Sequence, residues 1–164
     1  MRVLGIDPGT YSMGVGVVTA NGPDLAMAHS GVISPRRKDP LSERLRFLFD
    51  GLTRVFHEWE PSEVAIESPF AGQNIKAAMA IGQAQGVAML VAAQSGLTVT
   101  HYAPRQVKQA VTNHGGSSKD QVQEMVSVLL GLDTAPESSD AADALAVAIC
   151  HINASEAAML EMRE

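Results

Sequence analysis

The sequence predicts an α/β fold in which a mixed five-stranded sheet is flanked by helices. The 164-residue chain begins with three strand-like apolar segments, continues with helical and strand-like segments in alternation, and ends with helical segments alone. This order is typical of a mixed sheet covered by helices, and the chain length suits one hydrophobic core. We therefore expect residues 1–164 to form a single domain, with residues 152–164 as a frayed tail.

The predicted strands are short apolar runs bounded by turn residues. Pro8 and Gly9 end the first strand, and Asn21-Gly22 is a strong signal for an antiparallel hairpin between the second and third strands. Gly14 and Gly16 inside the second strand suggest a bulge or the close approach of another backbone. The predicted strands cover residues 1–7, 13–20, 25–34, 63–68 and 97–102.

The helices are predicted from apolar spacing and from their end signals. The first carries apolar residues mostly at spacings of three and four, and Pro61 stops it. Gly96 closes the second helix, while Ser118 and Ser139 are suitable N-terminal caps for the last two. The predicted helices cover residues 40–59, 74–94, 104–111, 118–130 and 139–152.

The composition excludes several classes of protein. An apolar fraction of 46%, spread along the whole chain, is unlike a disordered protein. The single cysteine, Cys150, excludes an internal disulfide framework and a cysteine-based zinc site, and a free thiol fits a reducing, cytoplasmic setting. The N-terminus shows no secretory signal, and polar residues interrupt the low-charge stretch 77–97 too often for a membrane span.

Four acidic residues occupy positions that suit metal chemistry. Asp7 and Glu67 each end an otherwise apolar strand, where a carboxylate is desolvated unless a cation or hydrogen-bond donors meet it. Asp140 and Asp143 are three residues apart in the first turn of the last predicted helix and so share one face. Each acid alone is better explained as a cap or turn residue, so the combination carries the prediction of a shared site.

A divalent cation would explain why these acids are placed together. Carboxylates at neighbouring strand ends repel one another unless a cation lies between them. An all-oxygen ligand set suits Mg²⁺ and Mn²⁺ equally. Two such ions form the arrangement that cleaves phosphodiesters in many nucleases.

The same acids lie in segments that resemble the RuvC family of Holliday junction resolvases. The segments occur in the order and at the spacing of that family, and they cover the chain to about residue 152. They are Gly5-Ile6-Asp7-Pro8-Gly9-Thr10, Ala65-Ile66-Glu67 with Phe70, Arg105-Gln106-Val107-Lys108-Gln109, Lys119 with Gln121-Val122-Gln123, and Asp140-Ala141-Ala142-Asp143-Ala144-Leu145-Ala146.

The resemblance implies a ribonuclease H-like fold and a crossover junction endodeoxyribonuclease. Such an enzyme cuts four-way DNA junctions in pairs of symmetric hydrolytic steps during recombination and repair, and leaves ligatable 5′-phosphate and 3′-hydroxyl ends. It would act beside the RuvA and RuvB branch-migration proteins. The catalytic ligands of two Mg²⁺ or Mn²⁺ ions would be Asp7, Glu67, Asp140 and Asp143.

The net charge of −6 is unlike that of a typical nucleic-acid-binding protein, so DNA binding must depend on local groups of basic residues. By resemblance, Lys108 and Lys119 contact phosphates, and Arg105 shares a helix face with Lys108. Phe70 is interpreted as a stacking platform for an unpaired base, with a packed lid as the alternative. Asn74 is a further candidate for backbone contact. The group Arg36–Lys38 is interpreted as solvated surface charge.

The long helix over residues 74–94 predicts a homodimer. Its apolar residues cover more than one face, which is typical of a helix buried on several sides, and its small residues allow close approach. One side would meet the sheet and the other a second subunit. A four-way junction has near two-fold symmetry and needs two cuts, which a two-fold dimer supplies.

Other functions remain open from the residues alone. The Asp7-x-Gly9-Thr10 pattern also resembles the phosphate loop of actin-like ATPases, although those proteins need a second such domain and phosphate motif. A nuclease of the same fold acting on RNA–DNA hybrids or structured RNA would share Asp7 and Glu67. A non-catalytic DNA-binding relative would normally lack one of the four acids.

Overall fold

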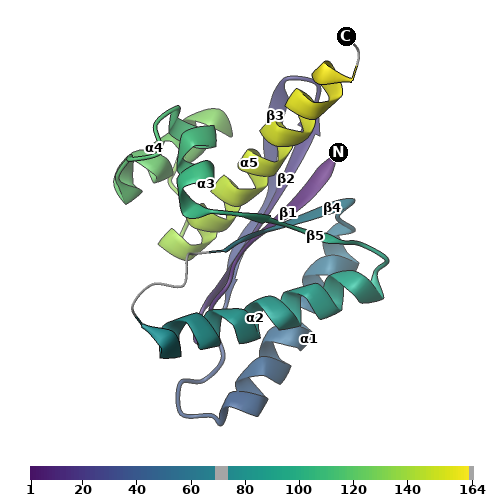
Figure 1. The fold of residues 1–164 in the computed structure, drawn as a ribbon, viewed down its shortest axis with the longest axis vertical. Coiled ribbons are helices and arrows are strands. Elements are labelled where there is room, and N and C mark those ends of the chain that lie inside the picture. Colours follow the sequence, from purple (N-terminus) through teal and green to yellow (C-terminus); the bar gives the residue numbers. More distant parts are fainter. Residues whose placement is uncertain (69–73, 163–164) are drawn as a thin grey trace.

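The computed structural model describes residues 1–68 and 74–162, which form one mixed sheet covered by helices on both faces (Figure 1). The sheet has five strands in the order β3-β2-β1-β4-β5. The strands are β1 (Arg2–Asp7), β2 (Met13–Asn21), β3 (Asp24–Ile33), β4 (Glu63–Glu67) and β5 (Val99–Tyr102). The predicted α/β class and the five strands are confirmed.

The strand directions explain where the site lies. β1, β2 and β3 form an antiparallel meander, and Gly22 in the β2–β3 turn has a φ of 58°, which favours glycine. β4 is parallel to β1, with Ile66 opposite Ile6, and β5 is parallel to β4. The C-terminal ends of β1 and β4 therefore lie side by side at one edge of the sheet.

Two apolar clusters hold the helices against the sheet. α1 (Leu41–Trp59) and α2 (Ile75–Gln94) cover one face, where they pack on inward side chains such as Leu4 and Ile66. α3 (Pro104–Thr112), α4 (Lys119–Leu129) and α5 (Ser139–Glu161) cover the other face, around Val3 and Ala65 (Figure 1). The alternation of side chains along each strand divides the core in this way.

Glycines in β1 and β2 allow α5 to approach the sheet closely. A Cβ atom added at Gly14 would collide with the carbonyl oxygen of Asp140, and one at Gly5 would collide with that of Ala144. The close approach expected at Gly14 and Gly16 is thus confirmed. The irregularity in the β2–β3 pairing lies instead between Val17 and Val18.

The last helix differs from the prediction at both ends. Ser138, and not Ser139, is the N-cap, and its hydroxyl accepts from the backbone N–H of Ala141. The helix also continues nine residues beyond Ile152, to Glu161. The segment is rich in alanine and contains neither glycine nor proline, so nothing in it stops the helix.

α2 is buried on one side only. Ala84, Ala88, Val91 and Ala92 face the core, while the rest of its apolar surface is largely exposed. Among the described residues it is the one helix long and apolar enough to cross a membrane. This is weak evidence for a membrane, because the helix packs along α1 and contributes to the core.

Candidate metal centre

Four carboxylates gather at the edge where β1 and β4 end. Asp7 is the last residue of β1 and Glu67 the last of β4. Asp140 lies in the first turn of α5, which crosses this edge, and Asp143 lies one turn later. We call Asp7, Glu67, Asp140 and Asp143 the carboxylate cluster.

Three members of the cluster are close enough to share one ion. Asp7, Asp140 and Asp143 each offer an oxygen, and these oxygens all lie within 4.8 Å of one another. Glu67 is outside this group of three, but its charge raises the pKa of Asp7, and the charge of Asp143 raises the pKa of Glu67. The structure thus brings the four predicted acids together, with Glu67 at the margin.

The electrostatics of the cluster favour a cation. Burial, followed by repulsion from Glu67, Asp143 and Asp140, raises the pKa of Asp7 from 3.8 to about 7. Burial and the charge of Asp143 also raise the pKa of Glu67. Part of the cluster would be protonated at neutral pH without a counter-charge, because like charges in a partly buried site oppose ionisation.

The two lysines that were predicted to contact DNA phosphates lie beside these acids. The Nζ of Lys119, the first residue of α4, is 2.7 Å from Oδ2 of Asp143, and this hydrogen bond raises the pKa of Lys119. Lys108 on α3 lines a cavity of about 160 Å³ together with Glu67 and Lys119. The positive charges of Lys119 and Lys108 partly offset the increase in the pKa of Glu67. These lysines supply the positive charge nearest the cluster on this side.

Ser12 is a neighbour of the cluster that the sequence analysis missed. Its hydroxyl donates a hydrogen bond to Oδ2 of Asp140, across a separation of 128 residues. A serine in a polar turn gives no sign in the sequence of so distant a partner. The contact fixes Asp140 relative to the β1–β2 turn that follows Asp7.

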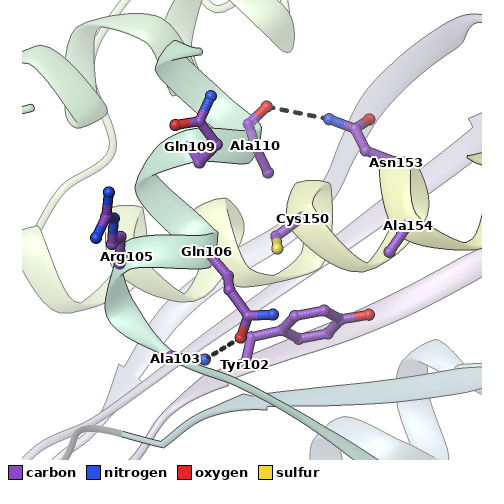
Figure 2. Close-up of a pocket in the computed structure, with 9 residues that line it drawn as sticks. All are labelled: Tyr102, Ala103, Arg105, Gln106, Gln109, Ala110, Cys150, Asn153 and Ala154. Carbon is purple, nitrogen blue, oxygen red and sulfur yellow. Dashed lines mark hydrogen bonds between the residues drawn. The ribbon is translucent and has the colours of Figure 1, made fainter. Parts of the chain in front are cut away.

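The other predicted DNA-binding residues lie farther from the acids. Arg105 lines a different cavity, of about 780 Å³, which residues of α3 and α5 enclose (Figure 2). Asn74 is the N-cap of α2, and its side-chain oxygen accepts from the N–H of Ala77. Phe70 lies outside the described residues.

The donor set fits a hard divalent cation. All of the candidate ligand atoms are carboxylate oxygens, which suit Mg²⁺ or Mn²⁺ far better than softer metals. Such an ion would offset both the burial and the repulsion that hold the pKa of Asp7 near neutrality. The residues present therefore fit a metal centre at the C-terminal edge of β1 and β4.

Comparison with known proteins identifies the family. The family model for crossover junction endodeoxyribonuclease RuvC matches residues 3–151. This chain belongs to the RuvC family. The RuvC protein of Dehalococcoides mccartyi strain 195 is 50% identical over 151 residues, which are 92% of each chain.

Solved structures agree with the RuvC assignment. The structure of Thermus thermophilus RuvC in complex with a Holliday junction substrate gives a TM-score of 0.91 at 35% identity, over 96% of both chains. The yeast mitochondrial Holliday junction resolvase Ydc2 gives a TM-score of 0.65 at 14% identity, over 91% of this chain and 76% of that one. The second comparison supports the ribonuclease H-like fold alone.

Proposed function

We propose that this protein is a structure-specific endonuclease that resolves four-way DNA junctions. The carboxylate cluster carries the proposal, because it lies in a RuvC-family chain that matches, over nearly its whole length, a relative whose structure contains a Holliday junction. The reaction is the hydrolysis of one phosphodiester in each of two symmetric strands during recombination and repair. Its products would carry 5′-phosphate and 3′-hydroxyl ends.

The carboxylate cluster would hold two divalent ions, Mg²⁺ or Mn²⁺, in each active site. When bound, such ions activate a water molecule and stabilise the charge on the leaving oxygen. Asp7 is central because the charges of the other three acids all raise its pKa. Ser12 restrains Asp140, and the strand pairing of β1 with β4 fixes the spacing of Asp7 and Glu67.

The lysines would place the DNA backbone over the metals. Lys119 already lies against Asp143, and Lys108 lies near Glu67. An ammonium group beside the scissile phosphate offsets its charge and gives affinity that falls with added salt. Phe70, Asn74 and Arg105 remain candidates for contacts with the DNA outside the scissile phosphate.

A homodimer through α2 would supply the second active site. Ile75 is 74% exposed and Met79 is 61% exposed, and Met89 continues the same apolar stripe. A Cβ atom added at Gly82 or Gly86 would meet open space, so another backbone has room to approach there. An apolar stripe with small residues suits helix packing between two copies of the chain.

We propose a single nuclease domain over residues 1–164 and a place in the cytoplasm, where chromosomal DNA and the RuvA and RuvB proteins would be its partners. Cys150 fits this setting, because it is a buried thiol whose pKa burial raises to about 11.

Junction cleavage is the direct test. A synthetic mobile four-way junction, a linear duplex and an RNA–DNA hybrid are incubated with the protein in Mg²⁺, in Mn²⁺ and in EDTA. Paired, ligatable nicks in the junction alone, absent in EDTA, are expected. Cutting of the hybrid instead would contradict the junction assignment, although it would leave the metal centre intact.

A further inference from the structure

Arg44 on α1 is a buried charge without an acidic partner. Its residue is 8% exposed, and Nη1 donates to the carbonyl oxygen of Thr10 at 3.2 Å and to its hydroxyl at 3.1 Å. Its Nε has no hydrogen-bond partner within residues 1–68 and 74–162. Among the described residues the ion pairs involve Arg46, Lys119 and His151, and none includes Arg44.

Two neutral hydrogen bonds do not account for this burial. Moving a guanidinium group out of water is costly unless an anion meets it. Arg44 is therefore prepared for an anion that comes from outside the chain.

Tyr11 holds the guanidinium in place. The Cζ atom of Arg44 lies 3.9 Å from the centroid of the Tyr11 ring, and Arg37 approaches the same ring at 5.5 Å. Tyr11 is 47% exposed, so the ring forms an open wall. Stacking on an aromatic face fixes an arginine plane without neutralising its charge.

These residues line a groove that leads to the metal centre. The groove has a volume of about 640 Å³. Asp7 and Asp140 lie along it together with Tyr11, Arg44 and the exposed Lys76 of α2. The carboxylate cluster thus lies between two basic surfaces, because Lys108 and Lys119 line a separate cavity with Glu67 and Asp143.

We propose that Arg44, stacked on Tyr11, binds a DNA phosphate that flanks the scissile phosphodiester. The inference rests on the proposed function, which brings a DNA strand to the carboxylate cluster. A strand that passes the cluster from Lys108 and Lys119 continues into this groove, where the Arg44 guanidinium that lines the wall donates to a phosphate oxygen. Guanidinium and phosphate form strong charge-assisted hydrogen bonds. The contact fixes which phosphate lies over the metals.

A scan with neutral phosphates tests the contact directly. Single methylphosphonates, which lack the phosphate charge, are placed one at a time along the cleaved strand near the cut. Junction affinity is measured in EDTA for the wild type, for Arg44→Gln and for Arg54→Gln, which removes the same charge from an exposed position on α1. Circular dichroism melts establish that each variant is folded.

One position is expected to behave differently in Arg44→Gln. The wild type and Arg54→Gln should lose about tenfold in affinity when one flanking phosphate is neutralised, as for a hydrogen bond between charged groups. Arg44→Gln should lose less than about twofold at that position and keep its sensitivity at the others. Tyr11→Ala, which retains Arg44, should show a partial loss at the same phosphate, and it replaces Arg44→Gln if that variant does not fold.

Equal sensitivity of the wild type and of both groove variants at every phosphate would overturn the inference. Junction cleavage by the wild type in Mg²⁺ would then still support the proposed function. A wild type that neither binds nor cuts the junction would overturn both proposals.

Discussion

Asp7→Asn should stop junction cleavage and, without metal, make the protein more stable. The substitution keeps the size of the side chain but removes one charge from the carboxylate cluster. Ionisation of Asp7 is opposed by burial and by three nearby acids, which together raise its pKa from 3.8 to about 7. Under the proposed function Asp7→Asn removes a metal ligand, so cleavage should be lost, whereas junction binding by the lysines should be retained.

The magnitude follows from the linkage between proton binding and folding. The raised pKa of Asp7 means that the folded protein holds a proton that the unfolded chain has released between about pH 4 and pH 7. The metal-free wild type therefore loses stability as the pH rises through this window. Each pKa unit is worth about 1.4 kcal/mol, so the full loss is about 4 kcal/mol by pH 8. Asp7→Asn lacks this loss.

Urea unfolding in EDTA at pH 5 and pH 8 measures the effect. Asp7→Asn should exceed the wild type by about 2–4 kcal/mol at pH 8, and by roughly half as much or less at pH 5. Mg²⁺ should stabilise the wild type and leave the variant nearly unchanged. Asp133→Asn, an exposed loop acid, is the matched control and should behave as the wild type. An Asp7→Asn protein no more stable than the wild type at pH 8 would refute the charge-repulsion argument.

Three further changes test the fold, the dimer and the DNA contact. Gly14→Ala places a Cβ against the carbonyl oxygen of Asp140, so we expect a loss of about 1–3 kcal/mol in urea unfolding and at least tenfold slower cleavage; wild-type values would contradict the close approach of α5. Met79→Arg puts a charge on the exposed stripe of α2, and light scattering should then report a monomer where the wild type is a dimer; a monomeric wild type at micromolar concentration would remove the dimer proposal. Phe70→Ala should slow cleavage more than it weakens binding, measured by single-turnover rates and by gel shift, and an unchanged rate would favour the lid interpretation.

The parts of this structure that the sequence predicts are those set by local patterns. Apolar runs that end at turn residues located all five strands, and Asn21-Gly22 located the hairpin. The last helix was placed one residue late at its cap, because Ser138 and Ser139 are equivalent by sequence, and was ended too early at Ile152. Residues 153–161 favour a helix by their composition, but they carry no apolar pattern from which the end of the helix could be predicted.

The acids were predictable, and the contacts that organise them were not. Asp7 and Glu67 interrupt apolar strands, so the sequence itself shows a charged group at a position where burial is expected. The bonds from Ser12 to Asp140 and from Lys119 to Asp143 join residues far apart in the chain. Arg44 shows the same limit, since its position on α1 gives no sign of the groove that it lines.

The close contact of α5 with the sheet connects the fold to the metal centre. The first two turns of α5 present small buried residues to the strands, namely Ala141, Ala142 and Ala144. Gly5 and Gly14 meet them with no side chain, so the helix backbone touches the backbone of β1 and β2. Larger side chains at these positions would hold the helix farther from the sheet, and the short side chains of Asp140 and Asp143 would then lie farther from Asp7. The glycines and alanines that pack this region therefore determine how closely the three aspartates approach one another.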